Sequence, residues 1–259
     1  MLCVGLDTDP ALIPAHLRSL PDPVFAFNRE IIDATHDLCV AYKPNIAFYE
    51  SLGRSGWESL ERTMDYIRKL PRPVFTIADA KRGDIGNTAK MYARTFFEYL
   101  QFDSVTVAPY MGEDSVKPFL EYPDKTAIVL ALTSNPGSSD FQLMEQGGEK
   151  LYERVIRRAC QWGTSENLMF VVGATHPSLF RSLRILAPDH FFLVPGIGAQ
   201  GGDLLSVCQN GMNSSFGLLI NSSRQILYAS NGHDFALKAR QQAAEINAQI
   251  QNIAFNQTI

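Results

Sequence analysis

Residues 73–84 read PVFTIADAKRGD, an apolar run that ends in a cluster of charges. The apolar part has the composition of a strand that is covered on both faces. Asp79 and Lys81 are two residues apart, so their side chains are predicted to share one face of this strand. Burying such charges is costly unless a function or a tight network requires them, so the cluster indicates a functional site. In the structural alternative, Asp84 or Thr88 caps the next helix, and the lysine only neutralises its neighbour.

Further apolar runs of the same kind recur along the chain, at 2–7, 39–45, 104–110, 126–134, 168–175, 191–199 and 216–224. Segments with the 3.6-residue period of helices lie between them, including 23–38, 57–70, 88–101, 147–162 and 234–254. Strand and helix alternate eight times, which predicts an α/β fold, a (β/α)8 TIM barrel that forms one domain over residues 1–259. An open doubly wound sheet is the alternative. Nothing precedes the first run to cover its end, so we expect the barrel to lack an N-terminal helix.

The composition is that of a soluble globular enzyme, with 46% hydrophobic and 19% charged residues. The formal charge of −4 offers no basic face for a nucleic acid, and no apolar stretch is long enough to cross a membrane. The four cysteines have no CxxC spacing, and the histidines have no metal-ligand spacing. We therefore expect a cytoplasmic protein with no metal site and a small-molecule substrate.

Polar residues gather at the predicted carboxyl ends of the strands. They are Asp7, Lys43, Asn45, Asp79, Lys81, Thr133, Ser134, Gln200, Ser223 and Arg224. In a (β/α)8 barrel, this rim is where the active site is built. The glycine-rich segment 196–203, GIGAQGGD, could by itself mark only a tight turn. Together with Arg224 at the end of the next strand, it predicts a phosphate site.

The segment DAKRGDI, residues 79–85, resembles the D-x-K-x-x-D-I motif of the orotidine 5′-phosphate decarboxylase family, in the form typical of one bacterial branch. The resemblance extends from LCVGLD at 2–7 to NSSR at 221–224, which is nearly the whole chain. It implies a homodimeric barrel that converts orotidine 5′-monophosphate (OMP) to uridine 5′-monophosphate (UMP) in pyrimidine synthesis. It also implies that the reaction needs no metal or organic cofactor.

The same resemblance assigns roles to the charged residues. Lys81 would protonate C6 of the pyrimidine as carbon dioxide leaves, within a charged array that includes Asp79, Asp84 and Lys43. Asp7 would contact the ribose together with Lys43. Asp84 and Thr88 match the positions that reach into the neighbouring subunit's site, so both would be shared across the dimer interface.

Further positions match the substrate-binding segments of the family. Ser134 in LTSNPG would read the pyrimidine amide, and Pro195 would lie against the base. Gln200 and Arg224 would bind the phosphate. Many family members have glycine before this arginine, whereas this chain has Ser223.

The chemistry of this reaction fits the charge pattern. Losing carbon dioxide from a ring carbon that cannot delocalise the electron pair creates a localised carbanion, and no site for an organic electron sink is visible in the sequence. One alternative is a magnesium-dependent sugar-phosphate decarboxylase or aldolase of the same superfamily, which tends to place an acid where Lys43 stands. The other alternative is a non-catalytic barrel that binds a phosphate ligand.

Overall fold

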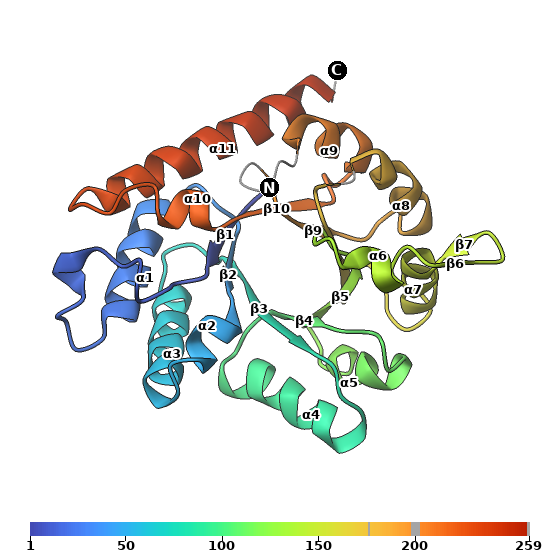
Figure 1. Cartoon of the computed structure of the whole chain (residues 1–259), viewed down its shortest axis with the longest axis horizontal. Helices are drawn as coiled ribbons and strands as arrows, with labels where there is room; N and C mark the ends of the chain where they lie inside the picture. The colour runs from blue at the N-terminus through green and yellow to red at the C-terminus, as the bar shows by residue number, and fades with distance from the viewer. Residues whose placement is uncertain (176, 198–202, 258–259) are drawn as a thin grey trace.

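The computed structural model describes residues 1–175, 177–197 and 203–257. Within them, eight parallel strands close into a barrel with helices around its outside (Figure 1). The strands are β1 (Leu2–Leu6), β2 (Ala41–Pro44), β3 (Phe75–Arg82), β4 (Ser104–Val107), β5 (Thr126–Leu132), β8 (Leu168–Val172), β9 (Phe192–Pro195) and β10 (Leu218–Ser222). They follow one another in chain order, and β1 pairs with β10 to close the ring. The predicted (β/α)8 barrel is confirmed, and the open sheet is wrong.

The helices of the described residues differ in length around the ring. The longer ones are α1 (Pro23–Thr35), α3 (Arg54–Arg68), α4 (Gly86–Arg94), α7 (Leu151–Ala159), α8 (Phe180–Leu186), α9 (Leu204–Gly211) and α11 (Phe235–Gln257). The shorter ones are α2 (Ile46–Glu50), α5 (Lys117–Leu120), α6 (Ser138–Phe141) and α10 (Arg224–Leu227). Single turns lie at η1 (Ala15–Leu17), η2 (Thr95–Tyr99), η3 (Glu113–Ser115) and η4 (Pro177–Leu179). None of the described helices has the length and apolar character needed to cross a membrane.

One carboxylate both starts α1 and joins it to the neighbouring helix. Asp22 precedes Pro23 and accepts a hydrogen bond from the backbone N–H of Phe25, which satisfies a free donor of the first turn. The same carboxylate accepts hydrogen bonds from Ser59 and Arg62 of α3. The cap therefore fixes the contact between two adjacent helices as well as the helix start.

The interior of the barrel is filled by side chains from alternate strand positions. Its apolar layer consists of Cys3, Ala41, Ile77, Ile128, Met169, Val171, Leu193 and Leu219. Two residues further along their strands come Lys43, Asp79, Pro195 and Asn221. Because residues two apart point to the same side of a strand, the alternation that packs the interior also brings polar side chains into the mouth.

The structure differs from the sequence prediction in the segment after β5. A helix was expected over 147–162, but α7 is shorter and a two-stranded hairpin, β6 (Glu145–Gln146) with β7 (Glu149–Lys150), precedes it. Gly147 and Gly148 have φ values of 64° and 79°. This left-handed backbone makes the tight turn of the hairpin and cannot belong to a right-handed helix.

Candidate active site

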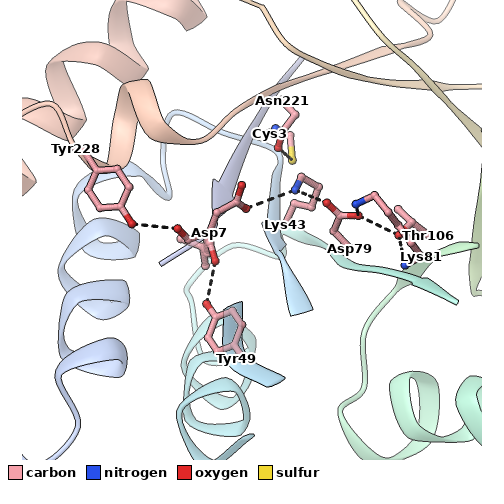
Figure 2. A network of polar contacts seen from close by, with 10 residues as sticks. Cys3, Asp7, Lys43, Tyr49, Asp79, Lys81, Thr106, Asn221 and Tyr228 are labelled. Carbon is pink, nitrogen blue, oxygen red and sulfur yellow. Dashed lines mark hydrogen bonds and ion pairs between the residues drawn. The ribbon is translucent and has the colours of Figure 1, made fainter. Parts of the chain in front are cut away.

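Four side chains form a chain of alternating charge at the carboxyl ends of β1, β2 and β3 (Figure 2). Lys43 Nζ lies 2.9 Å from Asp79 Oδ2 and 3.6 Å from Asp7 Oδ1. Lys81 Nζ lies 2.5 Å from the other carboxylate oxygen of Asp79. The array therefore contains two carboxylates and two ammonium groups. A group of opposite charge lies between the two carboxylates and between the two ammonium groups.

Burial distinguishes the two lysines. The Lys43 side chain is 5% exposed and the Asp79 side chain is 11% exposed, whereas the Lys81 side chain is 51% exposed. A buried ammonium needs close carboxylates to offset its desolvation, and Lys43 has two. Lys43 is therefore the fixed centre of the array, and the Lys81 ammonium is the cation that remains accessible to a bound molecule.

The array shifts the ionisation of its buried members. Burial alone would lower the pKa of Lys43, but the carboxylates of Asp7 and Asp79 outweigh it and hold the pKa above its ordinary value. Burial alone would raise the pKa of Asp79, but Lys43 and Lys81 outweigh it and hold the pKa well below its ordinary value. Both groups are therefore charged at neutral pH.

The lowered pKa of Asp79 predicts how stability depends on pH. A carboxyl whose pKa is depressed by folding stabilises the protein above its unfolded pKa of about 3.9, and this contribution disappears as the pH falls through the folded value. We expect Asp79→Asn to lower the free energy of unfolding most at pH 7 and progressively less below pH 4. Urea unfolding at several pH values measures this difference. A difference that stays constant with pH would contradict the assignment, and the exposed Asp114→Asn is the matched control for the loss of a carboxylate.

Lys81 reaches Asp79 through an irregular backbone. Its φ is 48°, a left-handed conformation that residues other than glycine rarely adopt, and the register of β3 against β4 shifts between Ala78 and Arg82. The prediction that the two side chains meet is confirmed by their contact. Simple strand alternation is not the reason, because the strand bends at Lys81.

A cavity of about 150 Å³ opens beside the array at the carboxyl ends of the strands. Its lining includes Asp7, Lys43, Asp79, Pro195, Ser223 and Arg224. Arg224 is the first residue of α10, and its exposed guanidinium forms no hydrogen bond or ion pair with the part of the chain that the structure describes. The cavity therefore has the charged array on one side and an uncommitted cation on the other, which suits a small anionic ligand.

Ser223 lines this cavity and faces Gly5 of β1. Its hydroxyl is buried and has no hydrogen-bond partner among the described residues. A Cβ on Gly5 of β1 would lie 1.8 Å from Ser223 Oγ. The Ser223 side chain fits at this point because the facing strand has a glycine there and so no side chain.

Comparison with known proteins identifies the family. A family model described as "Orotidine 5′-phosphate decarboxylase / HUMPS family" matches residues 1–239. The chain belongs to this family. The membership expected from the DAKRGDI segment is therefore confirmed.

Individual members of the family are similar over almost the whole chain. The curated orotidine 5′-phosphate decarboxylase of Phocaeicola vulgatus is 59% identical over 253 residues, which cover 97% of this chain and 93% of that protein. That of Flavobacterium johnsoniae is 58% identical over 252 residues, which cover 97% and 92%. The solved structure of Leishmania donovani OMP decarboxylase is 38% identical, with a TM-score of 0.85 and coverage of 98% and 94%.

The remaining positions suggested by the family motif follow β5, lie in or just before α4, or fall outside the described residues. Ser134 follows β5, and its backbone packs closely on Gly173. A Cβ added to Gly173 would lie 2.6 Å from Ser134 N. Gln200 falls outside the described residues. Asp84 accepts a hydrogen bond from the N–H of Ile85, and Thr88 is exposed on α4. The alternative that either side chain caps α4 is wrong, because α4 has no side-chain cap.

Two tyrosines that the sequence did not single out hold the strand end that carries Asp7 (Figure 2). Tyr49 donates its hydroxyl hydrogen to the carbonyl of Leu6 over 3.1 Å. Tyr228 donates to the carbonyl of Asp7 over 3.0 Å and accepts from the N–H of Asp9 over 2.8 Å. Both contacts join segments far apart in the chain, so no local sequence pattern signals them.

Proposed function

We propose that this family member decarboxylates OMP to UMP in pyrimidine biosynthesis. The observation that carries the proposal is the alternating array of Asp7, Lys43, Asp79 and Lys81 beside a cavity whose other side presents Arg224. In the reaction, the bond between C6 and the carboxylate breaks and its electron pair stays on C6. A proton from the Lys81 ammonium then forms the new C6–H bond, and the neutral amine regains a proton from solvent.

The size of the electrostatic effect explains why one lysine is not enough. An ammonium about 4 Å from the new negative charge stabilises it by about 4 kcal/mol at an effective dielectric constant of about 20. Enzymes lower their barriers by about 8–23 kcal/mol. The difference requires a prearranged array and binding energy from a remote part of the substrate, such as its phosphate.

Each remaining residue has a part in this proposal. Asp79 holds the Lys81 ammonium, and Lys43 keeps that carboxylate ionised. Asp7 and Lys43 face the ribose. Pro195 lies against the base and Ser134 reads its amide, while Gln200 joins Arg224 at the phosphate.

The phosphate role of Arg224 predicts a loss of substrate binding. Hydrogen bonds to charged groups contribute about 1.5–3 kcal/mol, so Arg224→Ala is expected to raise KM for OMP by about 10- to 100-fold. The exposed Arg181→Ala in α8 serves as the matched control. Activity on orotidine, which lacks the phosphate, should be the same for the wild type and for Arg224→Ala. Equal KM values for OMP in the wild type and in Arg224→Ala would contradict the phosphate role of Arg224.

The magnesium-dependent alternative is less compatible with this geometry. Lys43 Nζ stands 2.9 Å and 3.6 Å from the two carboxylates that a divalent cation would otherwise share. We therefore propose a reaction that needs no metal or organic cofactor. A protein that binds OMP without converting it would instead support the non-catalytic alternative, and loss of OMP absorbance distinguishes the two.

We further propose a homodimer in which Asp84 and Thr88 complete the neighbouring subunit's site. The segment of chain that carries both residues also carries exposed apolar side chains, since Ile85 is 50% exposed and Met91 is 54% exposed. Apolar surface of this kind supports an interface between subunits. Two-fold pairing would place the same residues of both subunits at that interface.

Mixed dimers test the sharing of Asp84. A Lys81→Ala chain paired with an Asp84→Asn chain has one complete site if Asp84 acts in the partner, and none if it acts in its own chain. Coexpression with random pairing is then expected to give about a quarter of the wild-type activity. Activity no higher than that of the separate variants, in a sample shown to be dimeric by sedimentation, would contradict the proposal.

We also propose that the protein works in the cytoplasm. Cys3, Cys39, Cys160 and Cys208 are all unpaired. Unpaired cysteines are typical of a reducing compartment, where disulfides rarely form. The substrate and product that we propose are nucleotides, which agrees with this setting.

A further inference from the structure

We propose that Thr106 is a positioning residue that directs the Lys81 ammonium toward the reacting carbon. Thr106 lies on β4 and is 1% exposed, and it is not one of the residues that the family motif identifies. It contacts both Lys81 and Asp79 (Figure 2). The inference rests on the proposed decarboxylation and adds a residue to its machinery.

The hydrogen bonds around Thr106 form a closed circuit. The backbone N–H of Lys81 donates to Thr106 Oγ1 over 2.9 Å, and Thr106 Oγ1 lies 3.1 Å from Asp79 Oδ1. The hydroxyl oxygen accepts the hydrogen bond from the Lys81 N–H. An ionised carboxylate can only accept, so the hydroxyl donates its single hydrogen to Asp79. Asp79 Oδ1 in turn accepts a hydrogen bond from Lys81 Nζ over 2.5 Å. One hydroxyl therefore links the main chain of Lys81 to the group that receives its ammonium.

The strand geometry explains why such a link is needed. Lys81 has a φ of 48°, and regular pairing of β3 with β4 stops after Ala78 and resumes at Arg82. The shift removes Lys81 from the strand ladder, and the threonine hydroxyl takes the place of the missing carbonyl acceptor. A left-handed conformation at a residue with a side chain persists only when its surroundings fix it.

The accessible position of Lys81 makes this support relevant to the reaction. Its side chain is 51% exposed, so it has rotamer freedom that the buried Lys43 does not have. A fixed backbone and a fixed carboxylate restrict where the ammonium can lie. Misplacement of a catalytic group by about 1 Å can cost about 100-fold in rate.

The experiment compares Thr106→Val with Thr106→Ser. Valine keeps the shape and loses both hydrogen bonds, whereas serine keeps the hydroxyl. We expect Thr106→Val to lower kcat for OMP by about 10- to 100-fold with KM within about threefold of the wild type, and Thr106→Ser to stay within about threefold in kcat. Rates are expressed per folded protein, measured by circular dichroism, so that a loss of folded enzyme is not counted as a loss of catalysis.

A matched control separates this role from simple packing. Thr126 is a buried threonine of the neighbouring strand β5, distant from the array at the opposite end of the barrel, and Thr126→Val is expected to leave kcat unchanged. An unchanged kcat in Thr106→Val, or a serine variant as slow as the valine variant, would overturn the inference. Absence of OMP turnover in the wild type would instead overturn the proposed function. In that case, hydrogen exchange of the Lys81 backbone amide would still test the hydrogen bond to Thr106. We expect Thr106→Val to speed this exchange, because the valine side chain cannot accept the hydrogen bond.

Discussion

Replacing Lys81 with alanine is expected to lower kcat for OMP decarboxylation by at least about 10³-fold. The loss of about 4 kcal/mol of charge stabilisation accounts for that factor, and the loss of the proton donor can contribute about 10²–10⁴-fold more. The carboxylate of Asp79 keeps its contact with Lys43, so the fold should survive the change. Absorbance at saturating OMP measures kcat directly.

The exposed Lys90→Ala variant in α4 controls for the removal of a lysine from the same part of the chain. Its kcat should equal that of the wild type. A Lys81→Ala enzyme that keeps more than a tenth of the wild-type kcat would contradict the role of the ammonium. The enzyme must be purified from cells that lack their own decarboxylase, because traces of it would hide a large loss.

Replacing Lys43 with methionine is expected to lower the free energy of unfolding by about 3–5 kcal/mol. The change leaves the Asp7 and Asp79 carboxylates without the buried cation between them, and an uncompensated buried charge is costly. Asp79 keeps its contact with the more exposed Lys81, so the loss falls mainly on Asp7. Urea unfolding at pH 7 measures the difference.

A double variant shows whether charge causes this loss. If the loss arises from the unpaired carboxylate of Asp7, Lys43→Met combined with Asp7→Asn should be more stable than the sum of the single changes predicts. Lys90→Met is the exposed control and should change the free energy of unfolding by no more than about 0.5 kcal/mol. Additive single changes, or a small effect of Lys43→Met, would show that the array is not electrostatically coupled.

The barrel could be predicted because its strands are buried on both faces. Each apolar run had to be covered by helices on one side and by the barrel interior on the other, and the observed strands lie at the predicted runs. The hairpin of β6 and β7 was missed because its strands are two residues long and consist of polar residues, exposed in β6 and half-buried in β7, so they carry no hydrophobic signal.

The array could be predicted in part. Asp7, Lys43 and Asp79 end apolar strands, and in a closed parallel barrel such ends converge. The contribution of Thr106 depends on the bend at Lys81, and that of Tyr228 depends on a contact with a residue 221 positions away. Such contacts arise from tertiary structure and leave no periodicity in the sequence.

The most direct test of the account is incubation of the wild-type protein with OMP in the presence of an excess of a metal chelator. We predict complete conversion to UMP with release of one equivalent of carbon dioxide, at a rate that the chelator does not change. Failure to convert OMP, or conversion that requires added magnesium, would contradict the claim that the charged array performs the decarboxylation without a metal.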